Sequence, residues 1–161
     1  MDILWAPWRM KYVSGAESPA GCLFCTAVAD GDDATQGVLA RDARAFLILN
    51  AFPYAAGHLM VATRRHVGSP EDLEAEEALG VWRLAQRAVT ALRAVYRPDG
   101  FNLGVNVGRA AGAGIEGHLH LHVVPRWAGD TNFMPVVGAV KVMPESLAET
   151  YRRLRPHFEP A

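Results

Sequence analysis

The sequence contains few cysteines, no long hydrophobic run and no excess of charge of either sign. Two cysteines in 161 residues exclude a disulfide-stabilised scaffold. No apolar segment approaches the ~20 residues that a membrane helix needs, and the N-terminus has no basic stretch followed by an apolar run. We therefore expect a cytoplasmic protein with no membrane partner.

Lysine and arginine (16) nearly balance aspartate and glutamate (17), so the formal net charge is −1. Proteins that bind nucleic acid as their main task carry a clear basic excess, so we expect no nucleic-acid partner. The length suits one domain over residues 1–161, and 50% hydrophobic residues exclude disorder. We divide it into an N-terminal segment with the cysteine pair (1–36), a core (37–127) and a C-terminal extension with a helix (128–161).

Five runs have the composition or the alternation of β-strands: residues 38–41, 44–50, 59–63, 101–107 and 118–124. Pro125 is expected to end the last of them. The connections between strands are too short for parallel crossovers. We therefore predict an α+β fold with a mostly antiparallel sheet of about five strands.

One long helix and one C-terminal helix complete the expected fold. Ser69 followed by Pro70 has the pattern of a helix start, and residues 144–158 show a second amphipathic pattern. Residues 14–36 read as a loop around the cysteines. In the long helix, apolar residues recur at helical spacing until Pro98 prevents continuation: Leu79, Trp82, Ala85, Val89, Leu92 and Tyr96.

Three histidines, His118, His120 and His122, alternate with apolar residues near the end of the predicted sheet. A strand places them on one face, roughly 6.5–7 Å apart, so the outer two are about 13 Å apart. They cannot all reach one zinc ion, which binds nitrogen at about 2.0–2.1 Å. They could line an extended anionic group such as a polyphosphate, because an imidazole with a pKa of about 6.5 is largely neutral and nucleophilic at pH 7. An exposed histidine face with no role is the alternative.

Cys22 and Cys25 have the spacing of a chelating pair, but two ligands make only half of a tetrahedral site. In a reducing cytosol such a pair is either a metal half-site or a redox pair. No helix pattern begins at Cys22, which argues against a thioredoxin-like motif.

The segment Gly112–Gly117 formally satisfies the G-x-G-x-x-G pattern of dinucleotide-binding folds. That fold needs a helix to begin at the glycine turn, whereas here the turn is followed by the histidine strand. We therefore reject a dinucleotide-binding fold. A loop with few side chains still lets backbone N–H groups approach a phosphate.

His118-Leu-His120-Leu-His122-Val-Val resembles the signature of the histidine triad (HIT) superfamily of nucleotide hydrolases and transferases. The likeness covers most of the chain, since residues 47–50, 56–61, 64–67 and 106–108 are similar to the family's successive elements. Residues 4–9, the His118-to-Trp127 motif and residues 129–133 resemble the bacterial diadenosine tetraphosphate phosphorylase branch. The resemblance implies a HIT-like fold and a nucleotidyl transfer in two steps.

In such a transfer, His120 would attack the α-phosphate of a dinucleoside polyphosphate and form a nucleotidyl-histidine, which water or inorganic phosphate would release. By the same resemblance, His122 would contact phosphate, Asn50 the ribose hydroxyls and Asn106 the phosphate side. Further candidates for nucleotide or phosphate contacts are Gly112, Gly114 and Trp127. The glycine loop departs from the family in having no hydroxyl before the triad, which leaves only backbone contacts there.

Metal-binding members of the superfamily imply four zinc ligands here, Cys22, Cys25, His66 and His118, in a closed structural site that fixes the strand of His120. We expect no organic cofactor. Histidine triad proteins commonly pair, so by analogy we expect a homodimer or a higher assembly.

Other functions stay open: a nucleoside phosphoramidate hydrolase, a non-catalytic nucleotide-binding module, and a metallohydrolase, for which four protein ligands leave no open metal position. His58 is either an orienter of a neighbouring group or a core histidine. Trp127 could close the nucleotide pocket, contact another subunit or simply pack. Ile48, Leu49 and Phe52 could line a base pocket, but apolar strand residues are core by default.

Overall fold

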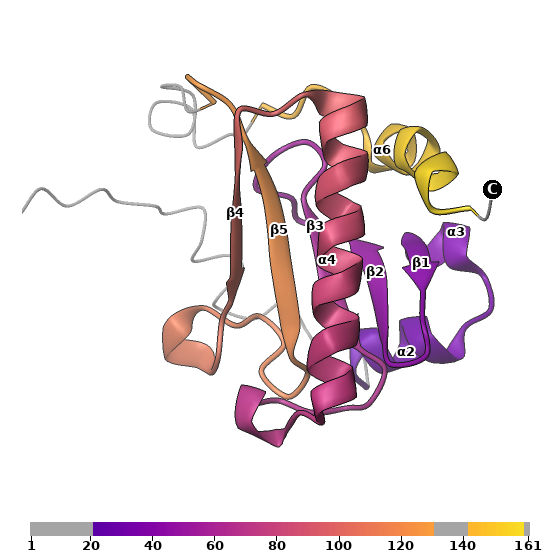
Figure 1. Cartoon of the computed structure of the whole chain (residues 1–161), viewed down its shortest axis with the longest axis vertical. Helices are drawn as coiled ribbons and strands as arrows, with labels where there is room; N and C mark the ends of the chain where they lie inside the picture. Colours follow the sequence, from indigo (N-terminus) through magenta and orange to yellow (C-terminus); the bar gives the residue numbers. More distant parts are fainter. Residues whose placement is uncertain (1–20, 131–141, 160–161) are drawn as a thin grey trace, which may run out of the picture.

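The computed structural model describes residues 21–130 and 142–159, and its centre is a five-stranded antiparallel sheet (Figure 1). The strand order is β1-β2-β3-β5-β4, and every pair of neighbours is antiparallel. This confirms the predicted α+β fold. The strands are β1 (Val38–Arg41), β2 (Ala45–Leu49), β3 (Leu59–Thr63), β4 (Gly100–Val105) and β5 (His120–Arg126).

One long helix and several short ones accompany the sheet. They are α2 (Leu23–Ala29), α3 (Asp33–Gln36), α4 (Ala75–Tyr96) and α6 (Leu147–Leu154), with single 3₁₀ turns η1 (Pro70–Asp72), η2 (Arg109–Ala111) and η3 (Arg155–Phe158). Within the described residues, no helix has the length and apolar character needed to cross a membrane. The motif at residues 4–9 and most of that at 129–133 lie outside the described part of the chain.

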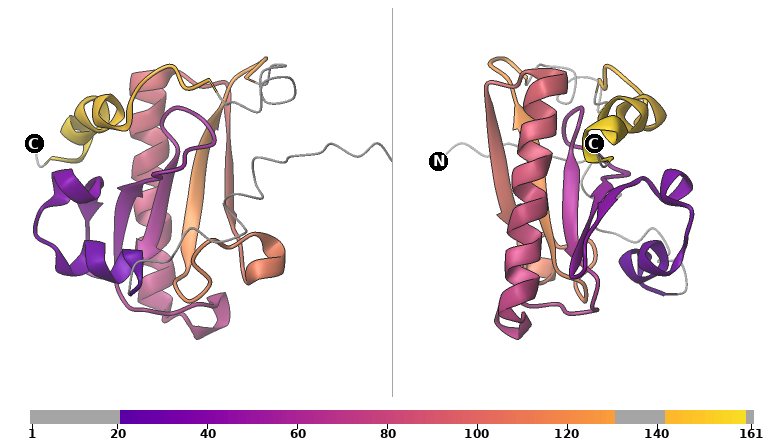
Figure 2. Two further views of the ribbon diagram at one scale, coloured as in Figure 1. Left: turned by 180° about the vertical axis from the view of Figure 1, so that it is seen from behind. Right: turned by 45° about the vertical axis from the view of Figure 1, so that its right-hand side comes forward.

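The sheet separates two hydrophobic clusters, because strand side chains alternate between its faces. One face packs against α4 through residues such as Leu47, Leu59 and Val123. The other packs against Phe24 of α2 through residues such as Ile48. Figure 2 shows α4 on one side of the sheet and α2 on the other.

The long helix begins later than predicted. Ser69 and Pro70 open only the turn η1, and α4 starts at Ala75 after a capping box in which the Glu74 and Glu77 side chains each accept a backbone N–H. The expected buried stripe is confirmed in part. Ala85 and Leu92 are buried as predicted, and Val89 and Tyr96 pack against the core. Leu79 and Trp82 are 47% and 55% exposed, and the helix also buries Val81, Leu84, Ala88 and Ala91.

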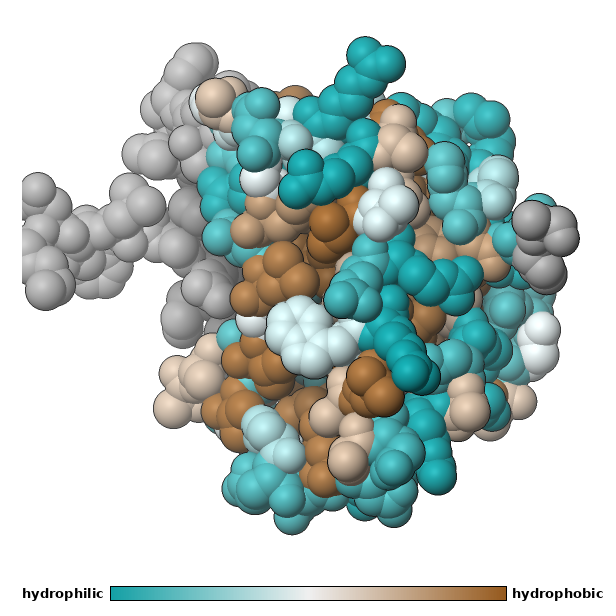
Figure 3. Space-filling model, in the orientation of Figure 1, coloured by the Kyte–Doolittle hydropathy of each residue, from teal (hydrophilic) through white to brown (hydrophobic). Residues whose placement is uncertain are grey.

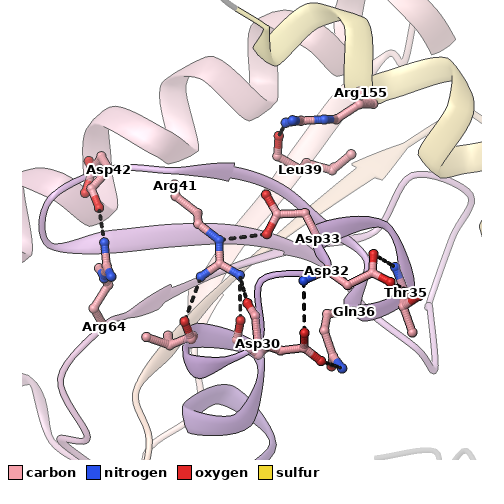
Figure 4. A network of polar contacts seen from close by, with 12 residues as sticks. Asp30, Asp32, Asp33, Thr35, Gln36, Leu39, Arg41, Asp42, Arg64 and Arg155 are labelled. Carbon is pink, nitrogen blue, oxygen red and sulfur yellow. Dashed lines mark hydrogen bonds and ion pairs between the residues drawn. The ribbon is translucent and has the colours of Figure 1, made fainter.

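The prediction that residues 14–36 form a loop is wrong from Leu23 onward, because α2 starts directly after Cys22. Sequence signals miss this helix since it has seven residues, no side-chain cap and no charge in its end turns. Tertiary contacts hold it instead. The guanidinium of Arg41, on β1, donates hydrogen bonds to the carbonyl oxygens of Ala27, Val28 and Asp30 at the end of α2 (Figure 4).

The histidine strand differs from its prediction at both ends. It begins at His120, so His118 precedes it, and it continues through Pro125 to Arg126. Beyond Val123 the strand has no partner residue on β3, and in the described part of the chain Pro125 is paired only with Phe101 of β4. A proline is tolerated at such a place, because its missing N–H removes no ladder hydrogen bond on the open side.

Candidate active site and metal site

His120 and His122 lie on one face of the sheet, as the alternation predicts, and this is the face opposite α4. They stand across β3 from Ala62 and Met60, and their ring centroids are 4.9 Å apart. The intervening Leu121 packs in the α4 cluster. The third histidine, His118, is fully buried before the strand begins. The triad is therefore divided into a pair and a separate member.

Two backbone carbonyls fix which nitrogen of His118 and His120 carries the proton. Nε2 of His118 lies 2.7 Å from the Thr63 carbonyl oxygen, and Nδ1 of His120 lies 2.8 Å from the His118 carbonyl oxygen. A carbonyl oxygen only accepts, so each of these nitrogens donates. In the neutral rings the lone pair is left on Nδ1 of His118 and on Nε2 of His120.

His58, whose role the sequence left open, is hydrogen-bonded to His122. The Tyr54 backbone N–H donates to Nδ1 of His58 at 3.0 Å, so the proton of neutral His58 is on Nε2. That Nε2 lies 3.0 Å from Nδ1 of His122 and donates to it. The proton of neutral His122 is consequently on its Nε2. This series of hydrogen bonds leaves His122 able to donate a hydrogen bond to a phosphate oxygen.

The sequence offered a weak signal for His58. It lies one residue before β3 and shares a face with Met60, which is paired with His122. Without the register of β3 against β5, that relation cannot be read from the chain.

Asn50, the predicted ribose contact, is buried beside His58. Its Oδ1 accepts the Phe52 N–H at 2.9 Å, and its Nδ2 lies 3.3 Å from Nδ1 of His58. It therefore stabilises the turn after β2. An amide oxygen has two lone pairs, so one remains for a further hydrogen bond.

The four predicted metal ligands come together. Cys22 and Cys25 lie at the start of α2, His66 just after β3 and His118 just before β5, and their four ligand atoms lie within 4.8 Å of one another. Nδ1 of His118 is 3.3 Å from Sγ of Cys22 and 3.6 Å from Sγ of Cys25, and Nδ1 of His66 is 3.3 Å from Sγ of Cys25. The Thr63 carbonyl leaves the lone pair of His118 on this same Nδ1. The cluster can hold a metal ion.

The helix α2 begins directly after Cys22, so the expectation that no helix starts at the cysteine pair is wrong. The surroundings of the thiols nevertheless disfavour a redox motif. Partial burial and the neighbouring Cys22 thiol raise the pKa of Cys25. Reactive redox cysteines have a lowered pKa. An arrangement of two thiols beside histidine nitrogens suits the binding of a metal cation better than it suits thiol–disulfide exchange.

The glycine loop lies between β4 and the histidines. Gly112 has a positive φ of 88° and its carbonyl accepts the Asn106 amide at 3.5 Å, while Gly114 is exposed. Asn106 therefore contacts this loop.

The indole of Trp127 donates to the Tyr96 carbonyl oxygen at 3.4 Å, at the end of α4. The structure thus ties Trp127 to the end of α4 through this hydrogen bond.

Burial lowers the pKa of all three triad histidines. For His118 and His120 burial outweighs the carbonyl hydrogen bonds, which act in the opposite direction. For His122 burial, with a smaller contribution from the charge of His120, lowers the pKa to about 4. All three rings are therefore neutral at pH 7, the form in which an imidazole can act as a nucleophile or a metal ligand.

The chain belongs to the HIT domain family, because the model of that family matches residues 32–129. AP-4-A phosphorylase of Mycobacterium tuberculosis (strain ATCC 25618 / H37Rv) is 40% identical over 158 residues, covering 94% of this chain and 81% of that protein. Bis(5'-adenosyl)-triphosphatase of Dictyostelium discoideum is 33% identical over 81 residues, 50% of this chain and 54% of that protein.

Among solved structures, a zinc-bound histidine triad family protein from Mycobacterium smegmatis has a TM-score of 0.68 and 29% identity, covering 85% of this chain and 92% of that one. The family resemblance predicted from the triad is confirmed.

The lowered pKa of His122 makes stability depend on pH. The unfolded chain binds a proton at His122 near pH 6.5, whereas the folded chain does so only near pH 4. The stability that is present above pH 6.5 is therefore lost as the pH falls from about 6.5 to about 4. We expect His122 to account for about 1–3 kcal/mol of that loss, less than the full shift because the ring is half-buried. Urea unfolding at pH 7 and pH 4.5 should show a smaller loss in His122→Asn than in the wild type. The exposed His157→Asn should behave like the wild type, and equal losses in all three proteins would contradict the prediction.

Proposed function

We propose that this protein transfers a nucleotidyl group from a dinucleoside polyphosphate, as a phosphorylase or hydrolase, through a nucleotidyl-histidine on His120. The observation that carries the proposal is the hydrogen bond from Nδ1 of His120 to the His118 carbonyl, which leaves Nε2 with its lone pair. The 40% identical relative named AP-4-A phosphorylase supports the substrate class.

In the first step, Nε2 of His120 attacks the α-phosphorus, and the bond from phosphorus to the oxygen of the leaving nucleotide breaks. With diadenosine tetraphosphate, AMP stays on the histidine and ATP leaves. In the second step, an oxygen of phosphate or water attacks the same phosphorus and the bond to Nε2 breaks. Phosphate yields ADP and water yields AMP. A covalent intermediate divides one difficult displacement into two easier ones.

The neighbouring groups have distinct roles in this proposal. His122 donates its Nε2–H to a phosphate oxygen, and the hydrogen bond from His58 keeps it in that tautomer. Asn50 accepts a ribose hydroxyl with its remaining lone pair. Asn106 holds the glycine loop through the carbonyl of Gly112, whose own N–H donates to the Arg109 carbonyl oxygen at 2.9 Å. Gly112 therefore shapes the loop, and the backbone N–H of the exposed Gly114 approaches the phosphates. Trp127 stays a candidate for a nucleotide contact.

We propose that the metal bound by Cys22, Cys25, His66 and His118 is zinc in a structural site. Zinc at about 2.3 Å from sulfur and about 2.0–2.1 Å from nitrogen holds tetrahedral ligand atoms roughly 3.3–3.8 Å apart, and the sulfur-to-nitrogen distances of 3.3 and 3.6 Å fit. When bound, zinc would cross-link α2 to the sheet. A cytoplasmic location, where thiols stay reduced, suits this role.

We also propose that two copies of the chain pair through β4 and the exposed side of α4. Among residues 21–130 and 142–159, β4 lies at the edge of the sheet, and the exposed apolar side chains on these elements include Leu79, Trp82 and Leu103, with Val107 just after the strand. Figure 3 shows apolar side chains gathered on this face of the molecule. An open strand edge flanked by apolar side chains favours pairing with another chain.

Incubation with diadenosine tetraphosphate, with and without inorganic phosphate, tests the proposed reaction. We expect ADP and ATP in the presence of phosphate for a phosphorylase, or AMP and ATP in its absence for a hydrolase. His120→Ala should lower turnover by at least about a thousandfold, because the covalent route is then closed. Product nucleotides are measured by chromatography.

The exposed His157→Ala is the control and should keep wild-type turnover. Full activity of His120→Ala would refute the covalent mechanism. Binding without turnover by the wild type would favour a non-catalytic module, and turnover of a nucleoside phosphoramidate alone would favour that hydrolase.

Gly117→Ala tests the metal site without removing a ligand. A Cβ at this position would lie 3.1 Å from Nε2 of His66, so the His66 ring must move. We expect zinc affinity, measured by competition with a chromophoric chelator, to fall about tenfold. Gly31→Ala, whose Cβ meets nothing within 4 Å, should leave it unchanged. Protein purified without chelator that contains no metal would refute the site.

Trp82→Arg tests the proposed dimer. A charge on the exposed apolar face should block pairing, so light scattering after size-exclusion chromatography should give the mass of one chain, against two for the wild type. Leu147→Arg, at a similarly exposed residue of α6, should remain paired. A wild type that elutes as a single chain at high concentration would contradict the proposal.

A further inference from the structure

Phe24 lies between the two cysteines in sequence and contacts both histidine sites. Its side chain is fully buried, and its ring centroid is 5.2 Å from that of His118 and 5.0 Å from that of His120. It has no polar atom and can neither bind a metal nor transfer a proton. This side chain can act on the chemistry through its packing against the histidine rings, which sets where those rings lie.

The ring of His120 needs such support. Its hydrogen bond to the His118 carbonyl fixes the Nδ1 edge, but one hydrogen bond leaves the plane of the ring free to tilt about that edge. Among the described residues, the aromatic contacts of His120 are with Phe24 and with His122, at 5.0 and 4.9 Å. Attack on phosphorus requires the lone pair of Nε2 to point along the line of displacement within about 10–20°.

The position of Phe24 is in turn set by α2, which cannot hold itself in place. A helix of seven residues is unstable alone, and α2 buries only Phe24 and Ala27. Arg41 fixes its C-terminal end through the carbonyls. At its N-terminal end, Cys22 and Cys25 lie on either side of Phe24 in the chain, so a metal that fixes both thiols also fixes the backbone of Phe24.

We propose that Phe24 is a positioning residue for His120, and that through Phe24 the metal bound at Cys22 and Cys25 sets the alignment of the nucleophile. This rests on the proposed function in two respects, that His120 attacks the substrate and that the cysteines bind a metal. A second path from the metal runs through His118, whose carbonyl accepts the hydrogen bond from Nδ1 of His120. The two paths make different predictions for variants of Phe24.

Phe24→Leu keeps an apolar side chain in the buried site but loses the flat ring that contacts His120. We expect kcat with diadenosine tetraphosphate to fall about tenfold while KM stays within about twofold, because the substrate still binds but attack is misaligned. Zinc content should equal that of the wild type. Phe158→Leu is the matched control, the same truncation in the cluster on the other face of the sheet. Equal kcat values for the two variants would overturn the proposal.

A spectroscopic test does not depend on activity. In protein labelled with ¹⁵N-histidine, ring ¹H–¹⁵N correlations report His120 separately from His66 and His118. Removing zinc with a chelator should shift the His120 signals of the wild type. In Phe24→Leu these signals should be displaced already, and zinc removal should then move His66 and His118 with little further change at His120. A His120 response equal to that of the wild type would assign the coupling to the His118 carbonyl alone and overturn the proposal.

The two proposals fail in different ways. If no nucleotide can be trapped on the protein and His120→Ala keeps full activity, the proposed reaction is wrong, while the spectra still decide whether Phe24 couples the metal to His120. If a nucleotide is trapped on His120 at the same rate in Phe24→Leu as in the wild type, the reaction stands and the positioning role of Phe24 is wrong.

Discussion

The arrangement of the site depends on one property of the backbone, that a carbonyl oxygen accepts hydrogen bonds and never donates them. The Thr63 carbonyl therefore holds the proton of His118 on Nε2, and the His118 carbonyl holds the proton of His120 on Nδ1. Two histidines only two residues apart are kept in opposite tautomers. One presents its lone pair to the cysteines and the other keeps Nε2 for chemistry.

This division explains how a single short segment serves two sites. His118 precedes β5 and is buried against the end of β3, whereas His120 and His122 follow the pleat of the strand. The metal site and the proposed reaction site therefore share one backbone carbonyl. Placement of the cysteines on a short helix that also packs against His120 adds a second connection between them.

The sequence pattern predicted the features that depend on local spacing along the chain. The alternation at His120 and His122 places both on one face, as the structure has them, and the antiparallel sheet follows from the short connections. Elements held by long-range contacts were missed. The helix α2 has no side-chain cap and no charge pattern, and contacts from Arg41 stabilise its end instead. Trp82 fits the helical repeat without being part of the buried stripe.

By itself the sequence determined the fold class, the family signature and the residue types that can bind metal or attack phosphorus. Only the tertiary structure decided that His58 hydrogen-bonds His122 across 64 residues, and that Phe24 contacts His120. The reason is physical. Local spacing fixes the face on which a side chain lies, but the partner it meets depends on strand register and on how distant segments pack, and both are set only when the whole core forms.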